Sequence, residues 1–195
     1  MLIAFEGGEA CGKSTQARIL AERLDAVLTR EPGATPVGAE LRRVVLDPTF
    51  DLDPRAEALV MAADRAQHVA TVVAPALAAG RHVVTDRYLY SSLAYQGYGR
   101  GLSLDEVRAL SAFAGAPEAD LVVFLAVPPA TRAARQGGDL DRIEAGGVEL
   151  HDRIEEGFHA LAAADPDRWI VLSGTGAVEE VSARVWAAVS AKMQG

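Results

Sequence analysis

A short stretch near the start of the chain carries the residue types needed to hold a phosphate. Gly7, Gly12, Lys13 and Ser14 fit the pattern G-x-x-x-x-G-K-[ST], which is typical of a phosphate-binding P-loop. Glycines let backbone N–H groups approach a phosphate closely, and Lys13 can reach the β- and γ-phosphates of a nucleotide. The Ser14 hydroxyl is an oxygen ligand of the kind that Mg²⁺ takes. This stretch therefore predicts phosphate binding with Mg²⁺.

The flanks of the stretch must position it, and they have suitable patterns. Residues 2–5 form an apolar run that predicts a buried parallel strand. Ala17, Leu20, Ala21 and Leu24 then recur at helical spacing. The order strand, glycine loop, helix is the one that a P-loop requires, and it disfavours the alternative of a chance match in a glycine-bearing turn.

The rest of the chain alternates strands and helices. Further strands are predicted at 26–29, 82–85, 121–127 and 169–172, with helices between them and a closing helix at 178–193. One long helix is predicted from Pro54 to about Ala79, and a polar loop at 96–101. Ser103 and Glu106 predict a capping box. This pattern predicts a single α/β domain over 1–195, of the P-loop NTPase type, with a five-stranded, mostly parallel sheet covered on both faces.

Charged residues follow the carboxyl ends of these strands, where ligands bind in such sheets. They are Glu9, the pair Arg30-Glu31, the pair Asp86-Arg87 and the lid arginines Arg132, Arg135 and Arg142. Arginines and carboxylates around one P-loop predict phosphoryl transfer, which depends on positioning and charge neutralisation. Two alternatives remain open: Asp86-Arg87 as a structural ion pair, and the basic segment as a solvated helix face.

Bulk properties exclude several classes of protein. The 195 residues are half hydrophobic and carry a formal net charge of −8, which argues against a general nucleic-acid binder. One cysteine, Cys11, excludes an internal disulfide. The first residues lack the pattern of a signal peptide, and no run is long enough to span a membrane. We therefore expect a cytoplasmic enzyme that acts on small molecules.

Five motifs, taken in order, resemble those of thymidylate kinases. They are the P-loop F-E-G…G-K-S-T-Q at 5–16, T-R-E-P-G-A-T-P at 29–36, A-A-D-R-A-Q-H at 62–68, D-R-Y…S-S-L-A-Y-Q-G at 86–97 and the lid sequence D-L-D-R-I-E at 139–144. The resemblance spans most of the chain. It implies a dTMP kinase that transfers the γ-phosphate of ATP to dTMP with Mg²⁺, giving dTDP, with a mobile lid at about 132–147.

The resemblance also implies roles for individual residues. The ATP phosphates are expected on Gly7, Gly8, Glu9, Ala10, Cys11, Gly12, Lys13, Ser14 and Thr15, with Ser14 and Glu9 towards the metal. The dTMP site is expected to include Glu31, Arg42, Met61, Arg65, Arg87, Ser92, Tyr95 and Gln96. Arg87 is expected on the dTMP phosphate, Arg65 on the thymine carbonyl and Tyr95 under the deoxyribose. Catalytic roles fall to Lys13, Arg87, Arg135, Glu9 and Asp86.

Departures from the family pattern leave some alternatives open. The P-loop carries no basic residue between Gly7 and Gly12, so Arg135, with Arg132 or Arg142, is expected to supply the extra charge from the lid. Met61 replaces an aromatic that stacks on thymine; it either packs on the base or fills the core. Ala10 replaces a common glycine, and Ser173-Gly174-Thr175 replaces the usual start of the adenine loop.

Rival functions are less consistent with the motifs. Another nucleoside monophosphate kinase conflicts with Ala94-Tyr95-Gln96-Gly97, and a GTP-dependent switch would need N-K-x-D and D-x-x-G sequences, which are absent. The resemblance also implies a homodimer that pairs helices, for which the long alanine-rich helix offers a face.

Overall fold

A parallel five-stranded sheet forms the centre of the computed structural model, which describes residues 1–135, 137 and 141–194. The strand order is β2-β3-β1-β4-β5, and all four pairings are parallel, which confirms the predicted α/β fold. The strands are β1 Leu2–Glu6, β2 Val27–Arg30, β3 Val83–Asp86, β4 Leu121–Ala126 and β5 Trp169–Ser173. Phe5 of β1 lies opposite Asp86 of β3. The segments that follow these two strands therefore start side by side at the carboxyl edge of the sheet.

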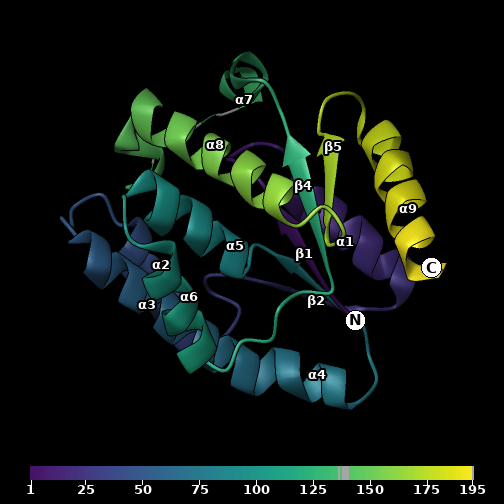
Figure 1. Cartoon of the computed structure of the whole chain (residues 1–195), viewed down its shortest axis with the longest axis horizontal. Helices are drawn as coiled ribbons and strands as arrows, with labels where there is room; N and C mark the ends of the chain where they lie inside the picture. Colours follow the sequence, from purple (N-terminus) through teal and green to yellow (C-terminus); the bar gives the residue numbers. More distant parts are fainter. Residues whose placement is uncertain (136, 138–140, 195) are drawn as a thin grey trace.

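Helices cover both faces of the sheet (Figure 1). α1 and α9 lie side by side on one face, and the other helices that contact the sheet lie on the opposite face. The helical segments are α1 Lys13–Leu24, α2 Pro36–Leu46, α3 Pro54–His68, η1 Val69–Val73, α4 Ala74–Ala78, α5 Leu89–Ser92, η2 Leu93–Gly99, α6 Leu104–Phe113, α7 Pro129–Arg135, η3 Glu144–Gly146, α8 Val148–Ala164 and α9 Val178–Gln194.

Side-chain alternation along the central strands builds two cores. Ile3 and Phe5 of β1 face the core shared with α1 and α9, whereas Leu2 and Ala4 face the core on the other side. Every residue of β1 is buried, as expected for a strand covered on both faces. The rigid centre of the sheet thus holds the chain segments that leave its carboxyl edge.

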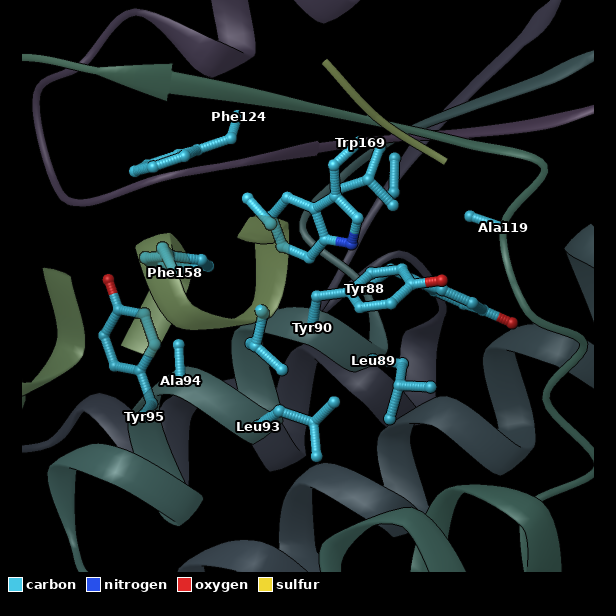
Figure 2. Close-up of a cluster of buried hydrophobic side chains, with 14 of the residues drawn as sticks. Tyr88, Leu89, Tyr90, Leu93, Ala94, Tyr95, Ala119, Phe124, Phe158 and Trp169 are labelled. Atoms are coloured by element: carbon cyan, nitrogen blue, oxygen red, sulfur yellow. The ribbon is translucent and has the colours of Figure 1, made fainter. Parts of the chain in front are cut away.

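The core that contains Leu2 and Ala4 also includes Tyr95, one of the predicted dTMP-site residues. Figure 2 shows Tyr95 at one end of this cluster, with its hydroxyl directed away from the other aromatic rings. Its ring makes an edge contact with Phe158, at 6.2 Å between centroids, and Phe158 stacks on Phe124 of β4. Packing therefore fixes the ring of Tyr95 while leaving its hydroxyl free for polar partners.

Two local predictions differ from the structure, and a third is confirmed. The stretch predicted as a loop from Gln96 is helical to Gly99, because the apolar residues Leu93 and Ala94 bury this segment in the core despite its glycines. Ser103 stands at the start of α6, but its side chain makes no capping hydrogen bond. The long helix predicted from Pro54 is continuous, with the π-helical turn η1 inside it.

Part of the predicted lid lies outside the residues that the structure describes. Residues 136 and 138–140, which include Asp139 and Leu140 of the lid motif, lie outside the described residues. In the remainder of the chain, no helix is both long enough and apolar enough to cross a membrane.

Candidate active site

The P-loop joins β1 to α1 and is folded tightly against the sheet. Gly7 has a φ of 142°, and a Cβ there would lie 2.8 Å from the carbonyl oxygen of Leu125, so only glycine fits. The Nζ of Lys13 donates to the Gly8 carbonyl at 2.9 Å. The structure thus gathers the predicted phosphate-binding residues in one turn: Gly7, Gly8, Glu9, Ala10, Cys11, Gly12, Lys13, Ser14 and Thr15. Ala10 adopts a left-handed φ of 55°, which costs roughly 1–2 kcal/mol for a residue with a Cβ.

A serine and an aspartate meet beside this turn. The Ser14 hydroxyl donates to Asp86 Oδ2 at 2.5 Å, and Asp86 Oδ1 is buried with no hydrogen-bond partner among the described residues. Hydroxyl and carboxylate oxygens suit Mg²⁺, which usually binds one or two protein carboxylates together with substrate phosphates. Across the described ranges, no cluster of three or more metal-binding side chains could hold a metal by itself. The residues present therefore fit a Mg²⁺ ion held jointly with a nucleotide.

Arg87 lies at the centre of a polar cluster next to the P-loop. It follows β3 with a left-handed φ of 68°, a strained backbone that is typical of functional sites. Its guanidinium forms an ion pair with Glu9 and donates to Tyr95 Oη at 2.9 Å, to Ser91 Oγ at 3.1 Å and to the Gly7 carbonyl at 3.1 Å. Four separate contacts hold the side chain that the sequence predicted to bind the acceptor phosphate.

The charges of this cluster are strongly coupled. Burial raises the pKa of Glu9, but the positive charges of Arg87 and Lys13 outweigh it and lower the pKa to about 2. The pKa of Arg42 is lowered by burial and by the like charges of Arg30 and Arg87. Arg30 and Arg87 are therefore close enough to repel Arg42, and an anion bound next to Arg42 would relieve that repulsion.

A cavity opens beside this cluster, and it is lined by five of the predicted substrate residues together with Glu9 of the P-loop. They are Glu9, Arg42, Met61, Arg87, Tyr95 and Gln96, joined by Ser91, Pro32, Val45, Leu46, Asp141 and Ile143. Met61 is 7% exposed and lines the cavity wall. This position supports a contact with a bound base over the alternative of a core filler alone.

Three other predicted substrate residues lie behind the cavity wall. Arg65 is 1% exposed and donates to Glu31 Oε2 at 2.8 Å, to Ser92 Oγ at 3.0 Å and to Ser111 Oγ at 2.9 Å. Glu31 also bonds to His68 Nδ1 at 2.8 Å. This network joins Arg65 to Glu31 and Ser92, and none of the three is among the residues that line the cavity.

The three lid arginines have different surroundings. Arg132 forms an ion pair with Glu155 at 3.2 Å, and its Nη1 lies 2.7 Å from where a Cβ on Gly8 would stand. Arg135 donates to the carbonyl oxygens of Ala10 and Gly174, at 3.4 and 3.1 Å. Arg142 donates to the carboxylate of Glu57 at 2.7 Å. Arg132 is thus next to the phosphate-binding turn, and Arg135 is near its outer end.

Two functional residues escaped the sequence analysis. Glu57 is 1% exposed and bonds to Gln96, Arg100 and Arg142, at 2.7, 3.1 and 2.7 Å. Ser91 was quoted only as part of a motif, yet it bonds to Arg87. The sequence offered one signal for Glu57, because it is a glutamate on the predicted inner face of a helix. A buried glutamate nearly always has a charged or polar partner, so this position could have been predicted to take part in a polar network.

Fold and site together define a P-loop phosphotransferase. A family model described as thymidylate kinase matches residues 5–185. A thymidylate kinase of Synechococcus sp. (strain JA-2-3B'a(2-13)) is 47% identical over 201 aligned positions, covering 99% of this chain and 96% of the relative. One from Deinococcus radiodurans is 46% identical, covering 97% and 96%.

A solved structure agrees with these relatives. The crystal structure of thymidylate kinase from Ehrlichia chaffeensis superimposes with a TM-score of 0.82 at 28% identity, covering 97% of this chain and 98% of that one. The chain belongs to the thymidylate kinase family. This membership confirms the predicted fold and the predicted activity, the phosphorylation of dTMP with ATP.

Proposed function

We propose that the chain transfers the γ-phosphate of ATP directly to dTMP, with dTMP in the cavity lined by Met61 and Gln96 and ATP on the P-loop. The observation that carries this assignment is the convergence of Arg42 and Arg87 on the cavity wall, next to the P-loop. Guanidinium groups there can bind the acceptor phosphate and aim one of its oxygens at the donor. The remaining barrier is lowered by neutralising the charge that moves between the two nucleotides.

Each residue then has a definite task. Lys13 and the P-loop amides hold the donor phosphates, and Arg87 holds the acceptor phosphate while Glu9 and Tyr95 fix its guanidinium. Ser14 and Asp86 are the protein groups that would hold Mg²⁺, and Glu9, which the sequence also predicted towards the metal, lines the acceptor cavity. When bound, Mg²⁺ supplies positive charge to the phosphate oxygens.

On the acceptor side, the sugar and base are expected to contact residues of η2 and α3. The ring of Tyr95 forms the floor beside Arg87, whose guanidinium lies 4.8 Å from the ring centroid. Met61 and Gln96 face the base, while Glu31, Arg65 and Ser92 support the wall behind it. A contact of Arg65 with the thymine carbonyl would use a guanidinium N–H outside these three hydrogen bonds, since the group has five donors.

Wider properties belong to the same proposal. The chain works as one domain whose lid, at about 132–147, brings Arg132 and Arg135 over ATP. The exposed apolar side chains of Leu59 on α3 and Phe113 on α6, 56% and 94% exposed, support a homodimer that pairs helices. A light-scattering mass of one chain would contradict the dimer. The nucleotide substrates are consistent with action in the cytoplasm.

The experiment that tests the proposed function is a coupled ADP-release assay across dTMP, dUMP, dCMP and dGMP, with ATP as the donor. We expect the highest kcat/KM with dTMP. The absence of a preference for dTMP would contradict the assignment of the cavity. The same assay with GTP in place of ATP measures how selective the donor site is.

A further inference from the structure

The two ends of the Gln96 side-chain amide have different surroundings. Gln96 is 1% exposed and lines the cavity that we assign to the nucleotide acceptor. Its Nε2 donates to Glu57 Oε1 at 2.7 Å. Its Oε1 is buried and has no hydrogen-bond partner in the part of the chain that the structure describes. A buried carbonyl oxygen without a partner is costly, so a ligand that donates a hydrogen bond to it would be favoured.

The chemistry of Glu57 dictates which end of the amide bonds to it. Burial raises the pKa of Glu57, but hydrogen bonds from Gln96 and Arg142 and the charge of Arg100 lower the pKa below its usual value. Glu57 is therefore an ionised carboxylate, which can accept hydrogen bonds and cannot donate them. Only the NH₂ end of Gln96 can bond to it, so the carbonyl end must point the other way.

Two arginines hold Glu57 in place from the opposite side. Arg142 Nη2 donates to Glu57 Oε2 at 2.7 Å, and Arg100 Nη2 donates to the same oxygen at 3.1 Å. Glu57 Oε1 accepts from Gln96 at 2.7 Å and, at the longer distance of 3.5 Å, from Arg100 Nε. The orientation of the amide thus depends on a carboxylate that does not itself line the cavity.

We propose, on the basis of the function proposed above, that Glu57 is a positioning residue that selects pyrimidines whose ring N3 carries a hydrogen. Thymine and uracil donate at N3, whereas cytosine presents a lone pair there. A fixed carbonyl of Gln96 pairs with the former and repels the latter. Glu57 thereby sets the preference for dTMP over dCMP through Gln96, and it makes no distinction between thymine and uracil.

The first test is Glu57→Gln. A glutamine at this position can donate to Gln96 Oε1, which allows the Gln96 amide to turn its NH₂ end to the cavity. We expect the ratio of kcat/KM for dTMP to kcat/KM for dCMP to fall by about tenfold or more, the effect of leaving a buried polar group badly paired. The swapped variant Glu57→Gln with Gln96→Glu restores an acceptor facing the base, and its ratio should rise again.

The matched control is Arg43→Gln, an arginine-to-glutamine change at an exposed position of α2 that pairs with Glu40 and is not part of the Glu57 network. Its base preference should match that of the wild type. An unchanged ratio in a Glu57→Gln variant that unfolds cooperatively and binds ATP would overturn the proposal, and so would a swapped variant with no recovery.

A second measurement needs no folded variant. The N3-methyl derivative of dTMP lacks the donor, so the wild type should bind it about tenfold more weakly than dTMP, or worse. Equal affinity would overturn the role of Glu57. Failure of the proposed function itself would look different, because the wild-type enzyme would then show no preference for dTMP at all.

Discussion

Glu9 and Arg87 form an ion pair between the P-loop and the end of β3, and the hydroxyl of Tyr95 bonds to both partners. The P-loop and the segment 87–95, which are far apart in the sequence, therefore fix one guanidinium at the junction of the two proposed nucleotide sites. Preorganisation of this kind avoids reorganisation cost when charge moves during transfer.

Replacement of Arg87 by alanine tests this junction. We expect kcat/KM for dTMP to fall by roughly 10²–10³, the usual cost of removing one donor to a transition-state oxygen. Thermal unfolding should change far less than activity. The control is Arg43→Ala, which removes an exposed arginine of α2 that pairs with Glu40. Turnover close to the wild-type value in Arg87→Ala would remove our assignment of the acceptor phosphate.

Replacement of Asp86 by asparagine tests the proposed metal position. The loss of a carboxylate next to Ser14 should raise the Mg²⁺ concentration needed for half-maximal activity, and high Mg²⁺ should restore part of the rate. Asp120→Asn is the control, because Asp120 accepts from the Leu2 amide at the opposite end of β1. A Mg²⁺ titration that is identical in Asp86→Asn and the wild type would rule out this site.

The two lid arginines that lie next to the P-loop, Arg132 and Arg135, should affect different kinetic constants. Arg132 is beside Gly8 in the phosphate-binding turn, so Arg132→Gln should lower kcat. Arg135 contacts Ala10 and Gly174 at the outer end, so Arg135→Gln should chiefly raise the KM for ATP. Steady-state kinetics with ATP and dTMP varied in turn would separate the two. The reverse pattern would support the sequence-based expectation that Arg135 is the catalytic one.

Glu6 predicts a pH-dependent stability. Burial raises its pKa from 4.5 to about 7, although hydrogen bonds from Ser91 and Tyr88 oppose the shift. Because the folded-state pKa lies above the unfolded one, the unfolded state releases the proton first, and stability falls as pH rises from about 4.5 to 7. Glutamine at this position cannot ionise. The free energy of unfolding of Glu6→Gln relative to wild type should therefore increase over this range, by on the order of 3 kcal/mol.

Denaturant unfolding at several pH values measures this difference. Glu149→Gln, at an exposed position in the first turn of α8, provides a control whose difference from wild type should stay nearly flat above pH 5. A flat difference for Glu6→Gln between pH 4.5 and 7 would show that Glu6 is ionised throughout.

Local patterns were enough to predict the sheet and the P-loop, because strand, loop and helix here follow one another directly. Gly7 and Lys13 needed no distant contact to be interpreted. The segment from Gln96 to Gly99 was predicted as a loop because glycine and polar residues hide its burial, which depends on packing against α8.

Side chains that act through distant partners were harder to place. Arg65 was expected on the base, but its hydrogen bonds go to Glu31, Ser92 and Ser111, which come from three other parts of the chain. Glu57 was not predicted as a site residue, because its proposed role depends on its hydrogen bonds with Gln96, Arg100 and Arg142. Spacing along one helix carries no information about such contacts.

The stereochemistry of transfer tests the central claim most directly. ATP made chiral at the γ-phosphorus with oxygen isotopes and sulfur can be converted with dTMP, and the configuration of the product determined. Direct in-line transfer between two nucleotides across Arg87 predicts inversion at phosphorus. Retention would require two displacements through a phosphorylated enzyme group, and it would contradict the account.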